Sequence, residues 1–264
     1  MNLLQIIAAT ASFETLQSIT VRRLMVASIL ALFPPVMLFL VLLVSQGTLF
    51  PVSMIICIFV FIVGQLSFLL WATPNVYSEL ESRGWIYLTA RPYGRVGLLF
   101  GKYIAAVANG WTVCVISMTM CLMIGESMAG FEVSPARLWI GFVGLISMAS
   151  ISYAAVYSLI GVIFQKRAMV IAVVYAFATD MIIANVPALI SKITLRYYVH
   201  GLAVSWLGIK FDRKLDPDAA TYLLFPAETP GWALVLSMFV MTGLALGAAT
   251  YIIRYREYVT SDES

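Results

Sequence analysis

The stretch ELESRGWIYLTARPYGRVGLLFGK, from Glu79 to Lys102, decides how the rest of the sequence is interpreted. It carries six charged side chains, whereas Leu49–Ser78 before it and Tyr103–Gly125 after it contain no Asp, Glu, Lys or Arg. Both flanking runs are long enough to cross a bilayer. The stretch, called the charged segment below, is therefore predicted to lie outside the hydrocarbon and to join two membrane spans.

The charged segment is predicted to form two helical pieces joined by a turn. Apolar and small residues recur at helical spacing from Tyr77 to Leu88, which favours a short helix with one apolar stripe. This helix ends before Pro92, because a proline ring disfavours helical backbone at the residue before it. A turn through Gly94 then leads to a second helix, which begins near Arg95 and continues into the membrane.

The composition is that of a polytopic membrane protein. The 264 residues are 62% hydrophobic and 11% charged, and the mean hydropathy is +0.96, far outside the range of soluble proteins. The formal net charge of +3 is too small to indicate nucleic-acid binding. Cys57, Cys114 and Cys121 fall inside apolar runs, and with His200 as the one histidine they indicate neither a disulfide framework nor a metal site.

Hydropathy describes residues 1–264 as a single transmembrane domain with six spans. Residues 1–23 favour an interfacial helical elbow over a signal peptide, with an ordinary frayed terminus as the alternative. Residues 79–102 form the cytoplasmic segment, and residues 191–231 form an extracytoplasmic segment with short helices in the outer interface. The spans are predicted at about 24–44, 52–72, 103–124, 138–164, 168–190 and 232–253.

The distribution of basic residues orients these spans. Ten of the 16 Lys and Arg residues fall in segments predicted to be inside, whereas the two short outer loops contain only Arg137. The other five lie in residues 191–231, where a long loop constrains topology less. The bias predicts a multi-pass protein of the cell inner membrane, with both termini cytoplasmic.

Three polar side chains inside the predicted spans are candidates for a translocation path. Gln65 and Asn109 carry amides that favour a hydrogen bond to a neighbouring helix. Asp180 lies near the middle of the fifth span with no intramembrane Lys or Arg to pair with, at a cost of about 2.5 to 3.5 kcal/mol. Three interpretations of Asp180 stay open: a proton or ion carrier site, a polar lining of the path, or a protonated side chain bonded to another helix.

Small residues form two helical surfaces. One recurs at steps of three or four from Gly144 to Gly161 in the fourth span, and the other is the GxxxG pair Gly243 and Gly247 in the sixth. Such surfaces let helix backbones approach closely. They can serve contacts within one chain or between chains.

The charged segment resembles the cytoplasmic coupling segment of ABC exporter permeases, in the type-two membrane-domain family. Six positions carry the resemblance: Glu79, Glu81, Pro92, Arg95, Gly101 and Lys102. The chain departs from the family at Arg83–Ile86, where the family commonly has Gly-Thr-Leu-Glu. The usual threonine and the third acidic residue are therefore missing.

The resemblance implies an all-α fold with an N-terminal interfacial elbow, six transmembrane helices, a cytoplasmic coupling helix and outer re-entrant helices between spans five and six. It implies a permease subunit that forms the path with a second copy or a similar chain. ATP and Mg²⁺ would bind to separate ATPase subunits, with no cofactor on this chain. The residues implied to contact the ATPase are Glu79, Leu80, Glu81, Trp85, Leu88, Pro92, Arg95, Gly101 and Lys102.

Other interpretations compete with this one. The basic residues Arg91, Arg95 and Lys102 can instead mark a cytoplasmic loop whatever the protein does. Lys102 is followed by Tyr103 rather than Ser or Thr, so the chain lacks a phosphate-binding loop, and no catalytic constellation is visible. A proton-coupled secondary carrier using Asp180 and a noncatalytic membrane scaffold are the alternatives, although no internal repeat supports a carrier.

Overall fold

The structure is a computed structural model of the whole chain. It describes residues 3–45, 52–75, 79, 94–128, 131, 134–164, 167–179, 194–207 and 230–256. Regular secondary structure in these residues is entirely helical, with eight α-helices and one 3-10 turn. Leu80, Glu81, Trp85, Leu88, Pro92 and Asp180, which the sequence singles out, lie outside the described residues.

The N-terminal third of the chain forms three helices. α1 covers Leu3–Ser18, α2 covers Val21–Ser45 and α3 covers Val52–Ala72, which continues into the 3-10 turn η1 at Thr73–Asn75. The helical path is interrupted at Ile19 and Thr20, between α1 and α2. α2 then begins with a hydrogen bond of 2.9 Å from the Leu24 amide to the Thr20 carbonyl.

The rest of the described chain contributes five helices. They are α6 at Gly94–Met128, α7 at Pro135–Ile163, α8 at Ala168–Phe177, α9 at Leu195–Leu207 and α11 at Gly231–Tyr255. Within the described residues, four helices are long and apolar enough to cross a membrane, namely α2, α6, α7 and α11. The predicted all-α fold is therefore confirmed, and the features fit a multi-pass membrane protein. The count of six spans stays a prediction.

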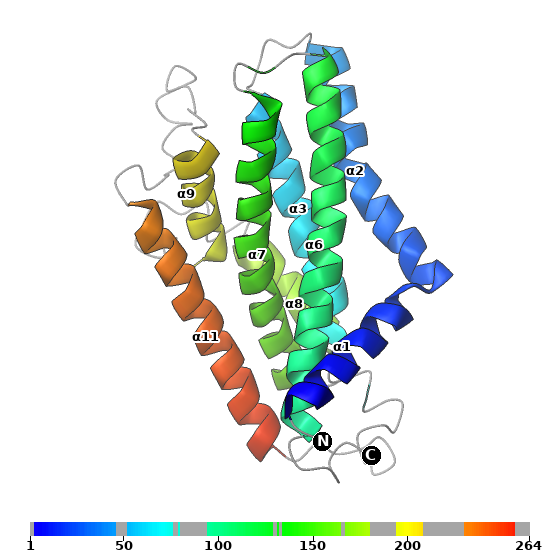
Figure 1. The fold of residues 1–264 in the computed structure, drawn as a ribbon, viewed down its shortest axis with the longest axis vertical. Helices are drawn as coiled ribbons and strands as arrows, with labels where there is room; N and C mark the ends of the chain where they lie inside the picture. Colours follow the sequence, from blue (N-terminus) through cyan, green and yellow to red (C-terminus); the bar gives the residue numbers. More distant parts are fainter. Residues whose placement is uncertain are drawn as a thin grey trace.

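The helices form an elongated bundle in which α6 and α7 run along the middle (Figure 1). α1 crosses the lower half of α6, α2 leans away on the same side, and α11 lies on the other side of α7. The start of α1, the start of α6 and the end of α11 all lie toward the same end of the bundle. The segments that the sequence predicts to be cytoplasmic thus share one end, called the inner end below.

α6 is longer than the span predicted from hydropathy. It has 35 residues, a length of about 52 Å at the usual rise, whereas the hydrocarbon core is about 30 Å thick. It begins at Gly94, close to the predicted start near Arg95, and continues without a break to Met128. The end of the charged segment and the predicted third span are therefore parts of one helix.

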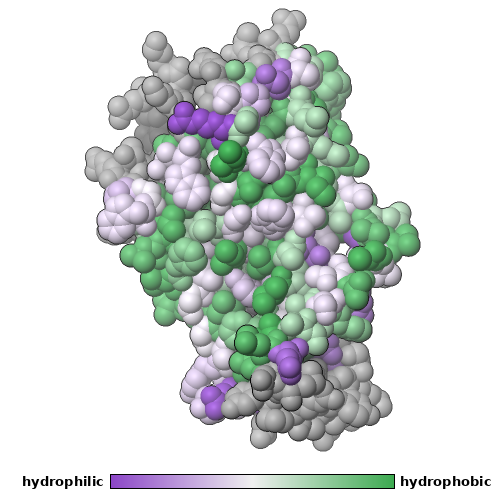
Figure 2. All heavy atoms as spheres, viewed as in Figure 1, coloured by the Kyte–Doolittle hydropathy of each residue, from purple (hydrophilic) through white to green (hydrophobic). Residues whose placement is uncertain are grey.

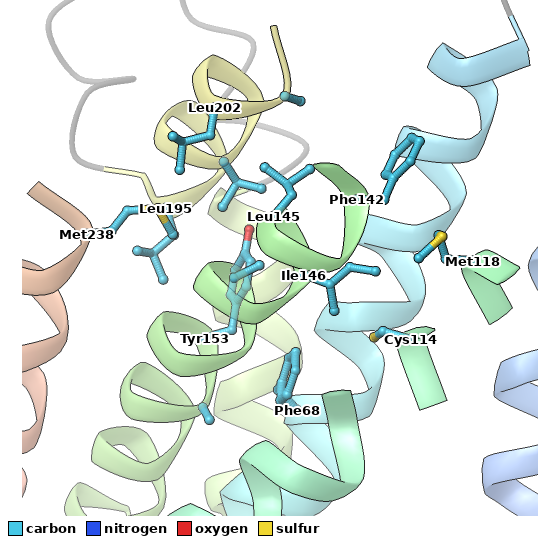
Figure 3. Close-up of a cluster of buried hydrophobic side chains, with 14 of the residues drawn as sticks. Phe68, Cys114, Met118, Phe142, Leu145, Ile146, Tyr153, Leu195, Leu202 and Met238 are labelled. Carbon is cyan, nitrogen blue, oxygen red and sulfur yellow. The ribbon is translucent and has the colours of Figure 1, made fainter. Parts of the chain in front are cut away.

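The main core surrounds α7. Phe68 from α3 and Leu145 and Tyr153 from α7 lie in the same buried cluster, together with Leu202 from α9 and Met238 from α11 (Figure 3). Since each of these side chains is at most 5% exposed, the four helices pack as one unit. α7 is the helix that they share.

Small residues on α7 permit this packing, as the sequence predicts. A Cβ added at Gly161 would lie 2.3 Å from the carbonyl oxygen of Thr73 in η1, and one at Gly144 would lie 3.2 Å from the Trp206 ring. Only glycine lets the end of α3 approach α7 so closely at Gly161. This surface serves contacts within the chain.

One side of α9 is buried in the bundle. It lies in the segment predicted to be extracytoplasmic, beside α7 and α11 at the end of the bundle away from α1 (Figure 1). Leu195, Val199 and Leu202 are buried in the main core. α9 is therefore an integral part of the bundle, and its position in the outer interface, expected from Tyr197, Tyr198 and Trp206, stays a prediction.

Hydrophobic and weakly polar residues cover the middle of the visible face, while strongly hydrophilic ones gather mainly toward its two ends (Figure 2). Large apolar side chains such as Ile29, Leu43 and Leu244 are exposed on α2 and α11. A surface of this kind suits lipid, which is as apolar as these side chains.

Candidate functional site

The candidate site lies at the inner end, where α1 packs across the first turns of α6. Both Gly97 and Gly101 are buried under α1. A Cβ added at Gly97 would lie 2.6 Å from Cγ2 of Ile6, and one at Gly101 would lie 2.6 Å from Cβ of Thr10. These two glycines therefore form a groove along α6 that α1 occupies.

Lys102 comes directly after Gly101 and is buried at the same contact. Its Nζ lies 2.8 Å from Oε1 of Glu14 on α1 and 2.8 Å from Oε1 of Glu79, and its side chain is 5% exposed. Glu79 and Lys102 are the first and last residues of the charged segment. We call Glu14, Glu79 and Lys102 the Lys102 cluster.

The electrostatics of the Lys102 cluster explain why it holds together. An isolated buried ammonium loses several kcal/mol of hydration, which only close opposite charges and hydrogen bonds can offset. Two carboxylates at 2.8 Å supply such partners for Lys102. The ammonium thus joins α1, α6 and the start of the charged segment in one place.

Arg95 lies on the first turn of α6 and is half-buried. It precedes Gly97 and Gly101 in the sequence, so it is at the end of the helix rather than within the groove under α1. Of the residues implied to contact an ATPase, Glu79, Arg95, Gly101 and Lys102 are described. The structure brings Glu79 and Lys102 into direct contact and buries Gly101 beside them.

Asn109 and Gln65, the described path candidates, occupy different surroundings. The Ser18 hydroxyl at the end of α1 lies within hydrogen-bond distance of two acceptors, the Thr15 carbonyl at 2.6 Å and Oδ1 of Asn109 at 3.3 Å. Gln65 is buried on α3, and in the described part of the chain no hydrogen bond joins it to Asn109. The bond from Asn109 to a neighbouring helix agrees with the sequence prediction, and its partner is α1.

Glu14 is the functional candidate that sequence reasoning missed. The sequence places it on the polar side of the predicted elbow but gives no partner, because its partner lies on a helix that comes after α2 and α3. A carboxylate within an otherwise uncharged stretch before the first span, Met1–Val21, was the available signal. The arrangement as a whole combines paired charges with close packing of α1 on α6.

No protein-family model matches the chain, and a comparison with curated proteins finds no match.

Proposed function

We propose that this chain is the membrane subunit of an ABC transporter, which forms the translocation path while separate ATPase subunits supply the energy. The proposed direction is export. ATP and Mg²⁺ bind to the ATPase partner, and the charged segment docks on it from the cytoplasmic side of the inner membrane. The proposal rests on the spacing of the charged segment and on the way in which that segment is attached to the bundle.

One observation carries the proposal: the two ends of the charged segment are tied to each other. The ion pair between Glu79 and Lys102 closes the segment into a loop on the end of α6, and Glu14 attaches α1 to the same ammonium. A force applied to such a loop reaches α1 and α6 together rather than being lost in a flexible connection. This is the property that a coupling segment requires.

The continuous α6 supports the same proposal. Because the end of the charged segment is the first part of a 35-residue helix, a displacement at Arg95 carries the whole helix with it. η1, which precedes the segment, contacts α7 at Gly161. Movement of the segment can therefore change how α6 and α7 lie against each other and open or close a path.

A path requires a second membrane subunit in this proposal, either another copy or a similar chain. α11 presents an exposed surface suited to such a contact, because nothing lies within 4 Å of a Cβ added at Gly243 or Gly247. Native mass spectrometry of the purified complex measures the stoichiometry. An active complex of one permease chain with one ATPase monomer would refute the dimer.

The experiment begins with purification of the tagged chain from its own membranes and identification of any co-purifying ATPase. The double variant Glu81→Gln with Arg95→Gln should lower ATP hydrolysis of the complex about tenfold, since hydrogen bonds to charged groups contribute about 1.5 to 3 kcal/mol each. The matched control, Glu126→Gln with Arg137→Gln, makes the same charge changes at exposed positions on the other end of the bundle. It should leave hydrolysis unchanged.

Folding and insertion are measured on the same samples. Loss of insertion in the Glu81 and Arg95 variant would assign those charges a structural role instead. If no ATPase co-purifies and transport is unchanged in the double variant, the coupling proposal is wrong.

The Asp180 variants separate the two transport mechanisms. Asp180→Asn keeps the polar contacts without titrating and should retain transport, whereas Asp180→Leu should lose it. Transport that is driven by an imposed proton gradient, needs no ATP and is abolished by Asp180→Asn would favour the secondary carrier.

A further inference from the structure

α2 is packed into the bundle along only its outer part. From residue 31 onward five of its side chains are buried, namely Ala31, Pro34, Pro35, Leu38 and Leu42, and the last two belong to the main core. In residues 21–30, by contrast, no described side chain is buried. Toward this end α2 also diverges from α6 (Figure 1). We call residues 21–30 the α2 arm, since they are attached to the bundle less firmly than the rest of the helix.

Two adjacent prolines lie close to the point where this packing changes. Pro34 and Pro35 are inside α2 and have no N–H. The carbonyls of Leu30 and Ala31, four residues earlier, therefore do not receive their usual helical hydrogen bonds. Sharp bends in helices concentrate at such positions. The α2 arm thus ends where the backbone of the helix is least constrained.

A pocket of about 320 Å³ lies between the α2 arm and the rest of the inner end. α2 contributes only Arg23 and Val26 to the lining, and both belong to the arm. The facing walls come from α1, α3, η1 and α6, and they include Trp71, Pro74 and Asn109. The arm is therefore one wall of the pocket, and the volume of the pocket depends on where the arm lies.

The other end of the α2 arm is joined to α1 by a short non-helical link. Ile19 and Thr20 form this link, and two residues of extended chain reach about 7 Å. The last residue of α1 is itself held at α6, because the Ser18 hydroxyl lies 3.3 Å from Oδ1 of Asn109. The arm can therefore shift by several Å while α1 stays on α6.

We propose that the α2 arm is a hinged lid, which turns at Pro34 and Pro35 and closes over this pocket. Because the pocket is present in this structure, the structure has the arm in its open position. Inward rotation brings Arg23 and Val26 toward α3 and α6 and reduces the volume of the pocket. The lid is a property of one chain and needs no ATPase, so it stands or falls separately from the transporter proposal.

The test measures distances between spin labels on the full chain by double electron–electron resonance. One pair joins Met25 on the α2 arm to Leu244 on α11, across the bundle (Figure 1), and the matched pair joins Leu43 on the outer part of α2 to Leu244. All three side chains are exposed. The labels are attached to cysteines at these positions after the three native cysteines are replaced by alanine. A ketone-bearing amino acid carries the labels if that background fails to fold.

The Met25 pair should give the wider distance distribution. Met25 lies about 14 Å along the helix from Pro34, so a rotation of about 20°, a size that proline kinks reach, moves it by about 5 Å. We expect its distribution to be wider than that of the Leu43 pair by about this amount, and to extend toward distances shorter than the one in this structure. Equal widths, or a widening only toward longer distances, would overturn the proposal.

Variants locate the hinge. Pro34→Ala with Pro35→Ala restores both backbone donors and should narrow the Met25 distribution to the width of the Leu43 distribution. The matched control is Pro135→Ala at the first residue of α7, where a proline removes no helical hydrogen bond. It should leave both widths unchanged. Each single variant restores one donor and should give an intermediate width, which tests the hinge if the double variant fails to fold. A Met25 distribution that stays wide after a donor is restored would overturn the proposal.

Discussion

Two GxxxG pairs in this chain have the same spacing and opposite surroundings. Gly97 and Gly101 on α6 are covered by α1, so an added Cβ at either would lie 2.6 Å from an α1 side-chain atom. Gly243 and Gly247 on α11 have nothing within 4 Å of an added Cβ. The motif permits close approach of a helix. It does not say whether the approaching helix belongs to the same chain.

The difference lies in the residues beside each pair. Lys102 follows Gly101, and its buried ammonium needs carboxylates as ion-pair partners. α1 supplies one of them, Glu14. On α11 the residues that follow the two glycines, Leu244 and Ala248, are apolar and exposed. Lipid or another helix satisfies such a face equally well. A charge beside a glycine pair is thus a stronger sign of internal packing than the pair itself.

Among the variants that test this difference between α6 and α11, removal of the Lys102 charge should have the largest effect on the free energy of unfolding. Lys102→Met leaves Glu14 and Glu79 close together without their cation, and breaking a buried ion pair in this way costs about 3 to 5 kcal/mol. We expect a corresponding loss in the free energy of unfolding, measured by denaturant titration in micelles. Addition of Glu14→Gln and Glu79→Gln should recover part of the loss. A triple variant less stable than Lys102→Met would contradict the role of the charges.

The second largest loss in the free energy of unfolding is expected when a larger side chain is placed in the α6 groove. Gly101→Leu places a side chain against Thr10 and the carbonyl of Ile7, which lies 3.1 Å from the added Cβ. Overpacking of this kind costs about 1 to 3 kcal/mol. Gly97→Leu should cost less, because its contact is the movable side chain of Ile6. The same unfolding titration ranks the two variants, and equal stability of wild type and Gly101→Leu would rule out the close packing of α1.

The hydrogen bond at the far end of α1 should have a smaller effect. Ser18→Ala removes the donor to Asn109 and should lower the unfolding free energy by about 0.5 to 1.5 kcal/mol. Ser127→Ala on α6 provides the control, since in the described part of the chain its exposed hydroxyl donates only to the Ile124 carbonyl of its own helix, as the Ser18 hydroxyl also does to Thr15. A Ser18→Ala effect no larger than that of the control would show that this hydrogen bond does not stabilise the contact between α1 and α6.

Substitution of the glycine pair on α11 should hardly change the free energy of unfolding of the isolated chain. In Gly243→Leu with Gly247→Leu the added Cβ atoms meet no neighbouring atom within 4 Å, so the unfolding free energy should change by less than about 0.5 kcal/mol, as is usual for surface substitutions. If α11 joins two membrane subunits, the same variant lowers the two-copy fraction in native mass spectrometry. A loss of several kcal/mol in the isolated chain would contradict the open surface.

Much of the helical layout could be predicted from the sequence, because apolar runs and basic flanks are local signals. The second span was predicted at 52–72, and α3 covers Val52–Ala72. The start of α6 could be inferred from the turn before Arg95, and the packing of the α7 glycines from their spacing. Six spans were predicted, while four helices in the described residues qualify by length and apolarity.

The candidate site could be predicted only in part, because its contacts join residues far apart in the sequence. Lys102 and Glu79 were singled out for an ATPase contact, which stays a prediction, and their pairing with each other was not foreseen. The partner of Glu14 can be identified only when the path of the whole chain is known. Hydropathy can be evaluated within one segment of sequence, whereas an ion pair depends on how two segments are placed in space.

The order of synthesis gives the contact between α1 and α6 a further consequence. A chain emerges from the ribosome with its N-terminus first, so α1 is made before the helix that receives it. Until Gly97, Gly101 and Lys102 have been translated, Glu14 has no ammonium to bind and α1 has no groove to occupy. The contact of α1 with α6 therefore forms only after α2, α3 and the start of α6 have been translated, although α1 is the first helix to be made.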